Sequence, residues 1–188
     1  MLGDSQGLVP RSREDILRRM RAAAGRREDP EDAVASIRAI RRAEFFRVAV
    51  ADLTEQVSLV EVGEALTDLT AATLDATLEV VVPSVEAELG REIGTDLLIV
   101  GMGRLGGREV GYASDADVLF VHDPHEGVDD QPAQEAATAV ITRVRALLGT
   151  PGSDPPLGLD ADLRPEGKAG PLVRSLASYR AYYDRWSE

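Results

Sequence analysis

The chain has 188 residues, 44% of them apolar, which is enough for one domain or two small ones with a buried core. Its 33 acidic and 21 basic residues give a formal net charge of -12, which would repel a phosphate backbone and excludes a nucleic-acid partner. The sequence has no cysteine, which excludes disulfides, and no apolar run of signal or membrane-spanning length, so we expect a cytoplasmic protein without a membrane partner.

Residues 1–92 are expected to form a helical region that packs on the rest of the chain. Three residues that are typical N-caps each precede an apolar pattern with helical spacing, which predicts three helices. These caps are Ser12, Asp29 and Ser58. The third helix should continue to about Gly90, and Pro83 is a position where it could be interrupted, because proline lacks the backbone donor.

Residues 93–188 follow a different pattern, in which short apolar runs alternate with loops and helices. The expected strands cover residues 97–100, 118–121 and 157–163. An amphipathic helix is expected over residues 133–148, and a C-terminal helix over residues 175–188. We therefore expect an α+β fold whose catalytic core, residues 93–188, is truncated before a C-terminal helical domain.

The stretch VGMGRLGGREVGYASDADVLF, residues 100–120, carries two competing signals. The first is G-x-G-x-x-G from Gly101 to Gly106, the pattern of a dinucleotide-binding turn. That turn needs a continuous helix after the glycines. Because Gly107 and Gly111 follow, and each glycine inside a helix costs about 1 kcal/mol relative to alanine, we disfavour this interpretation.

The second signal is the pair Gly106-Gly107 followed by Asp115 and Asp117 at the start of an apolar run. Alternate residues on a strand face the same side, with Cα atoms about 6.6 Å apart. Two carboxylates at that spacing suit a pair of hard divalent ions that are completed by substrate phosphates. The glycines let backbone N–H groups approach a triphosphate closely. Together these features are typical of a nucleotidyltransferase.

A third carboxylate is expected from Asp160 or Asp162, which face the same side if that segment is a strand, so spacing alone does not choose between them. Ser114 either binds a phosphate oxygen or caps the local backbone. His122 and His125 lack a third ligand and are interpreted as loop residues rather than as a metal site.

The sequence resembles the bacterial glutamine synthetase adenylyltransferase (glutamate-ammonia-ligase adenylyltransferase) family. The matching blocks are GMGRLGGRE from Gly101, SDAD from Ser114 and LRPEGKAGPLV from Leu163, and the resemblance covers residues 36–188. Members of that family carry two similar nucleotidyltransferase domains. One transfers AMP from ATP to a tyrosine of glutamine synthetase, which down-regulates nitrogen assimilation, and the other removes AMP by phosphorolysis.

The resemblance implies a nucleotidyltransferase (DNA polymerase β-like) fold, with a small mixed sheet flanked by helices and an N-terminal helical region. It implies ATP as substrate, two Mg²⁺ ions (or Mn²⁺) as cofactors, glutamine synthetase as protein substrate and the PII signalling protein as a partner. The residues from Glu109 to Asp115 and from Val121 to Asp123 look more like the C-terminal, adenylylating half. The alternatives are the adenylyl-removing half and a catalytically silent nucleotide-binding module.

The resemblance also assigns the candidate site residues. It implies that Asp115, Asp117 and Asp160 bind the metal ions and act in catalysis. The usual Asp-x-Arg pattern has aspartate at Asp162 here, which is either a further metal-facing acid or a salt-bridge partner. The candidates for binding the nucleotide are Gly106, Gly107, Ser114, Arg104, Arg164 and Lys168.

Overall fold

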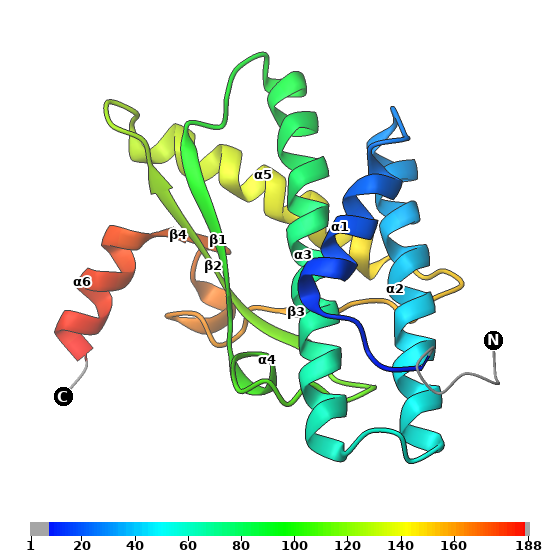
Figure 1. Cartoon of the computed structure of the whole chain (residues 1–188). Coiled ribbons are helices and arrows are strands. Elements are labelled where there is room, and N and C mark those ends of the chain that lie inside the picture. The colour runs from blue at the N-terminus through cyan, green and yellow to red at the C-terminus, as the bar shows by residue number, and fades with distance from the viewer. Residues whose placement is uncertain (1–7, 187–188) are drawn as a thin grey trace.

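The computed structural model describes residues 8–186 and is an α+β structure with helices on both sides of a small sheet (Figure 1). The helices are α1 (Arg13–Ala24), α2 (Pro30–Leu53), α3 (Leu59–Leu89), α4 (Gly103–Gly106), α5 (Asp130–Gly149) and α6 (Leu176–Trp186). The strands are β1 (Thr95–Gly101), β2 (Ala116–Pro124), β3 (Leu159–Asp160) and β4 (Val173–Ser175). The first seven residues and the last two of the expected C-terminal helix lie outside the described residues.

The three predicted N-caps begin α1, α2 and α3, as expected. Ser12 Oγ accepts a hydrogen bond from the N–H of Asp15 at 3.3 Å, and the Asp29 carboxylate accepts from the first turn of α2. Ser58 and Glu61 form a reciprocal capping box, because each side chain accepts from the other residue's backbone N–H. The N-cap side chains therefore determine the residues at which α1, α2 and α3 begin.

Helix α3 ends before Gly90, as predicted, but it is not interrupted at Pro83. Val81 and Val85, on either side of the proline, are buried in the same apolar cluster, with 0% and 4% of their surface exposed. Packing on both sides of Pro83 holds the helix together although one backbone hydrogen bond is missing. The expected end at Gly90 is therefore confirmed, and the possible interruption at Pro83 does not occur.

Strand β2 is the central strand of the sheet formed by residues 8–186. It pairs with β1 in antiparallel register along one edge. Along the other edge it pairs in parallel first with β3 and then with β4, and residues 161–172 leave the sheet between these two pairings. The third strand is therefore shorter than the predicted 157–163, and β4 was missed because three residues carry too little periodicity to be recognised.

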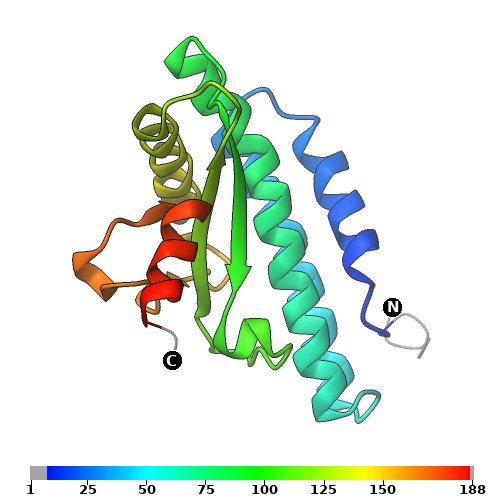
Figure 2. The ribbon, with the colours of Figure 1, turned by 90° about the vertical axis from the view of Figure 1, so that its left-hand side faces the viewer.

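The two faces of the sheet have different partners. Val118 and Phe120 of β2 point into the cluster formed with α3 and α5, whereas Leu119 and Val121 contact Tyr179 of α6. Figure 1 shows α6 on the opposite side of the sheet from α3, and Figure 2 shows α6 in front of the strands. Since side chains alternate along a strand, Asp117 shares the α6 face with Leu119.

One apolar cluster connects the helical region to the sheet. It includes Val34 and Leu66 from α2 and α3, Phe120 from β2 and Val140 from α5. A second cluster, which includes Leu69 of α3, holds α1, α2 and α3 together. The residues on either side of position 92 therefore share a core, and the division into residues 1–92 and 93–188 stays a prediction.

His122 lies on β2 and is buried, so its interpretation as a loop residue was wrong. Burial lowers the pKa of its imidazole, because the charged form would lose its hydration. Since the unfolded chain takes up a proton at pH values where the buried ring does not, the contribution of His122 to stability falls as the pH drops below about 6.5. His125 is exposed, with its Nε2 3.3 Å from Asp96 Oδ1.

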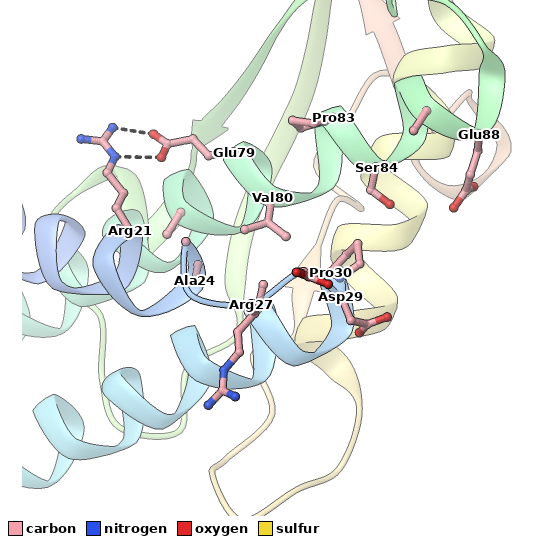
Figure 3. Close-up of a pocket in the computed structure, with 15 residues that line it drawn as sticks. Arg21, Ala24, Arg27, Asp29, Pro30, Glu79, Val80, Pro83, Ser84 and Glu88 are labelled. Carbon is pink, nitrogen blue, oxygen red and sulfur yellow. Dashed lines mark hydrogen bonds and ion pairs between the residues drawn. The ribbon is translucent and has the colours of Figure 1, made fainter.

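A pocket of about 670 Å³ lies between α1, α2 and α3 and is lined by none of the predicted site residues. Figure 3 shows Ala24, Val80 and Pro83 among the apolar residues that line it, and the ion pair with two hydrogen bonds between Arg21 and Glu79 that joins α1 to α3. In the part of the chain that the structure describes, no helix is both long and apolar enough to cross a membrane.

The core contacts of α3 predict a large stability effect at Leu69. Leu69→Ala should lower the free energy of unfolding by about 2–5 kcal/mol, because its side chain is 1% exposed and removal leaves a cavity. Leu53→Ala is the matched control, because Leu53 is 84% exposed, and should change it by no more than about 0.5 kcal/mol. Urea denaturation measures both, and equal effects would contradict this description of the core.

Candidate active site

The parallel pairing of β2 with β3 places Asp117 directly beside Asp160. Their Cα atoms are register partners, and neighbouring strands lie about 4.8 Å apart. Both residues are half-buried, and partners in register point to the same face of a sheet. The structure therefore brings together two of the three acids predicted for the site, from positions that are 43 residues apart in the sequence.

Asp115 precedes β2, so its place is set by the turn rather than by strand alternation. Its side chain is exposed and lies over Gly158, where a Cβ atom would come within 2.5 Å of Asp115 Oδ1. The N–H of Ala116 donates to the carbonyl of Gly158 at 2.9 Å. Gly158 thus lets the segment before β3 pass under the Asp115 carboxylate.

Gly103 lies under the Asp117 carboxylate at the start of α4. Its φ is +47°, and a Cβ atom there would meet Asp117 Oδ2 at 2.4 Å. The N–H of Met102 also donates to the carbonyl of Asp117 at 2.8 Å. The glycine-rich turn is therefore joined to β2, the strand that carries Asp117, through contacts that only glycine permits at position 103.

Gly106 and Gly107 have backbone N–H groups that are engaged inside the turn. They donate to the carbonyls of Met102 at 2.8 Å and Gly103 at 2.9 Å. A Cβ on Gly106 would lie 2.7 Å from the carbonyl oxygen of Gly101, so this glycine allows α4 to pack on the end of β1. The role of this pair in the structure is to shape the turn.

Arg104 and Ser114 contact each other across the turn between α4 and β2. Arg104 Nη1 donates to Ser114 Oγ at 3.3 Å, and the N–H of Gly111 donates to the same oxygen at 3.1 Å. Since the hydroxyl oxygen accepts both bonds, its own proton is available as a donor. Arg104 is exposed, so this turn offers a cation and a hydroxyl donor close in sequence to Asp115.

The loop of residues 161–172 holds the two other predicted cations, Arg164 and Lys168. Arg164 is 10% exposed and donates to the carbonyls of Ala161 at 2.7 Å and Gly170 at 3.3 Å, which fixes the loop. Lys168 is exposed and pairs with Asp162 Oδ2 at 3.0 Å, an interaction that raises the pKa of the lysine.

Asp162 lies beyond the end of β3, where strand alternation no longer applies. Its carboxylate is 3.0 Å from Lys168 Nζ and 3.6 Å from Arg164 Nη1, and its N–H donates to Asp160 Oδ1 at 2.8 Å. Of the two interpretations left open by the sequence, these contacts favour the salt-bridge partner.

The positions of Asp115, Asp117 and Asp160 decide whether these acids can hold a metal ion. Among residues 8–186, no three His, Asp or Glu side chains are grouped closely enough to hold an ion by themselves. The adjacent pair Asp117 and Asp160 still fits Mg²⁺, which is typically bound by one or two carboxylates while waters and substrate phosphates complete its shell.

Sequence reasoning missed the residues that connect α2 to this site. Tyr112, in the turn before Asp115, donates from its hydroxyl to Asp52 Oδ2 at 2.9 Å and packs edge-on against Phe45. Burial and this hydrogen bond raise the pKa of Tyr112 to about 12.

The sequence did contain one signal for a buried polar contact of α2. Arg41 is a charged residue four positions after Ile37, on the apolar side of this helix.

A pocket of about 630 Å³ borders the glycine-rich turn on the side facing α3. Its walls include Leu59 and Val60, which are exposed at the start of α3, together with Arg104 and Tyr112. Gly63 lets α3 approach this turn, because a Cβ there would meet the Cα of Glu109 at 3.2 Å. The turn is thus held between the sheet and α3.

The contact between Gly103 and Asp117 predicts that Gly103→Ala destabilises the chain more than Gly90→Ala does. Gly90 also has a positive φ, but a Cβ there meets nothing within 4 Å. Gly90→Ala should therefore lower the free energy of unfolding only by the about 1–2 kcal/mol that a left-handed conformation costs alanine. In an Asp117→Ala background the two alanine variants should cost the same. Chemical denaturation gives these values, and equal costs in the wild-type background would place the Asp117 carboxylate elsewhere.

The comparisons with known proteins identify one family. The family model described as glutamate-ammonia ligase adenylyltransferase matches residues 4–188, which extends the resemblance seen from residue 36 onward. A bifunctional glutamine synthetase adenylyltransferase/adenylyl-removing enzyme from Streptomyces avermitilis is 50% identical over 204 residues, which cover 100% of this chain and 20% of the relative.

Relatives with the same name occur in other bacteria. The protein from Cutibacterium acnes is 52% identical over 180 residues, which are 96% of this chain and 17% of the relative. The protein from Mycobacterium tuberculosis strain H37Rv is 49% identical over 173 residues, 92% of this chain and 17% of the relative. The chain thus spans no more than 20% of these relatives' length, and it belongs to the glutamate-ammonia ligase adenylyltransferase family.

Proposed function

We propose that this chain is a nucleotidyltransferase domain that moves AMP from ATP to a tyrosine hydroxyl of glutamine synthetase. The name of its relatives, glutamine synthetase adenylyltransferase/adenylyl-removing enzyme, supports glutamine synthetase as the acceptor protein and AMP as the transferred group. The reaction uses ATP, which agrees with the cytoplasmic location expected from the sequence. Family resemblance adds the PII signalling protein as a regulatory partner.

The observation that carries this proposal is the register of β2 with β3. Asp117 and Asp160 are neighbours across two parallel strands, and Gly103 leaves room for the Asp117 carboxylate. Two half-buried carboxylates beside a glycine-rich turn are suited to divalent ions with a nucleotide triphosphate.

The residues then have distinct roles. Asp117 and Asp160 would hold Mg²⁺ together with the triphosphate, and exposed Asp115 would complete the set when the nucleotide binds. Mg²⁺ bound there would supply positive charge that offsets the charge of the phosphates. Asp160 also accepts the proton of the incoming tyrosine hydroxyl, whose free pKa of about 10 is too high for attack at neutral pH.

The bond changes follow from this arrangement. The tyrosine oxygen attacks the α-phosphorus in line, the bond to the β-phosphate oxygen breaks, and pyrophosphate leaves. Other residues have supporting roles. Arg104 and the Ser114 hydroxyl would bind phosphate oxygens, and Arg104 can do so without breaking a buried contact because it is exposed.

The loop of residues 161–172 contributes differently. Arg164 supports the site by fixing this loop, and Lys168 would have to leave Asp162 to bind phosphate. Gly106 and Gly107 shape the turn that lines the triphosphate.

The proposal is tested by AMP incorporation. The chain is incubated with ATP labelled in the α-phosphate, Mg²⁺ and unmodified bacterial glutamine synthetase, and label on the synthetase is counted. Loss of a residue that only supports a metal ligand typically lowers activity about 10- to 100-fold. Because Asp117 is proposed to be a ligand itself, Asp117→Asn should lower the rate by more than this. Asp123→Asn, an exposed acid on the same strand, should leave the rate unchanged.

Two other outcomes have defined meanings. ADP released by phosphate from adenylylated synthetase, without incorporation, would assign the chain to the adenylyl-removing half. ATP binding with neither reaction would favour the silent nucleotide-binding module. Incorporation that survives in Asp117→Asn would contradict the role given to this carboxylate.

A further inference from the structure

Helix α2 carries two arginines that hold the segment leading into β3. Arg38 binds both oxygens of the Asp154 carboxylate, with Nε 3.1 Å from Oδ2 and Nη2 2.9 Å from Oδ1. Arg38 also donates to the carbonyls of Leu147 at 2.9 Å and Thr150 at 2.7 Å. The segment after α5 is thus attached to α2 by one guanidinium group.

Arg41, one turn further along α2, reaches the same segment from within the core. Its Nη1 donates to the carbonyl of Pro155 at 2.6 Å and lies 3.6 Å from Asp154 Oδ2. The side chains of Arg41 and Asp154 are each 7% exposed. Burial lowers the pKa of Arg41, so Asp154 and the carbonyl are needed to keep this charge in place.

The segment held by these arginines ends at the site. From Asp154 it continues through buried Leu157, whose N–H donates to Leu148 at 3.0 Å, to Gly158 beneath the Asp115 carboxylate. Two residues later it becomes Asp160. Because β3 contains only two residues, its own ladder is too short to fix this register, and the attachment at Asp154 supplies the missing constraint.

Arg41 is also linked to the turn before Asp115, through Phe45. Its guanidinium lies over the ring of Phe45, 5.8 Å from the centroid, and Phe45 packs edge-on against Tyr112 at 5.5 Å. Tyr112 belongs to the turn that leads into Asp115. A narrow gap beneath this turn is lined by Arg41, Phe45 and Tyr112 together with Ser114. One buried guanidinium therefore borders both segments that carry the site acids.

We propose that Arg41, together with Asp154, is a positioning residue that sets Asp160 beside Asp117 for binding of a divalent cation with a nucleotide triphosphate. This inference rests on the function proposed above. It predicts an effect on the cation requirement of nucleotide binding, not on the fold alone. The guanidinium contacts the segment that leads to Asp160 directly and the turn before Asp115 through Phe45, but it does not contact the acids themselves.

The test measures how much Mg²⁺ the full 188-residue chain needs for half-maximal binding of a non-hydrolysable ATP analogue, by calorimetry. Arg41→Lys and Asp154→Asn should each raise this concentration about tenfold, the effect typical of outer partners of a metal site. Arg42→Lys is the matched control, because Arg42 is exposed and contacts Ser153 of the same segment from outside. Thermal unfolding and circular dichroism verify that each variant is folded.

A double-variant comparison separates positioning from general support. If Arg41 acts through Asp160, then Arg41→Lys should add no further increase in an Asp160→Asn background. Arg41→Lys keeps the positive charge and carries the test if Asp154→Asn does not fold. Folded Arg41→Lys with an unchanged Mg²⁺ requirement, or an effect additive with Asp160→Asn, would overturn this inference alone. A wild-type chain whose nucleotide binding does not respond to Mg²⁺ would overturn the proposed function and this inference with it.

Discussion

Backbone pairing between β2 and β3 is the constraint on which the candidate site depends. It covers only two residue pairs, Ala116 with Leu159 and Asp117 with Asp160, yet it decides which acids can act together. A shift by one residue would turn Asp160 to the opposite face of the sheet. So short a ladder needs support from outside the sheet. The structure provides it through α4 on one side and through the segment that α2 holds on the other.

The helical region is therefore part of the site's architecture. Helix α3 is the common wall, because its apolar residues lie in the cluster shared with β2 and α5 and also in the cluster shared with α1 and α2. Helix α2 packs against α3 and carries Arg38, Arg41 and Phe45 toward the two acidic segments. The glycines at 103 and 158 then let the carboxylates lie directly over backbone. Apolar packing, the buried arginines and the glycines therefore all help to position the segments that carry Asp115, Asp117 and Asp160.

Much of this could be predicted from local signals. N-caps, helical periodicity and short apolar runs predicted α1 to α3, β1 and β2. The expectation that Asp115 and Asp117 both lie on a strand was wrong for Asp115, which precedes β2, and the role of the two acids stays a prediction. The sequence could not choose between Asp160 and Asp162 without the family resemblance, because the choice depends on where a two-residue strand stops. The attachment of Asp154 to Arg38 and Arg41 was missed for a related reason. It joins residues 113 to 116 positions apart, and no local pattern encodes such a contact.

Anomalous diffraction from crystals of the chain grown with Mn²⁺ and a non-hydrolysable ATP analogue tests most directly whether Asp117 and Asp160 together bind a divalent cation. If they do, a manganese peak lies within about 2.0–2.3 Å of a carboxylate oxygen from each of these two residues. A bound nucleotide whose manganese contacts neither aspartate, or only acids outside this pair, would show that Asp117 and Asp160 do not form the cation site.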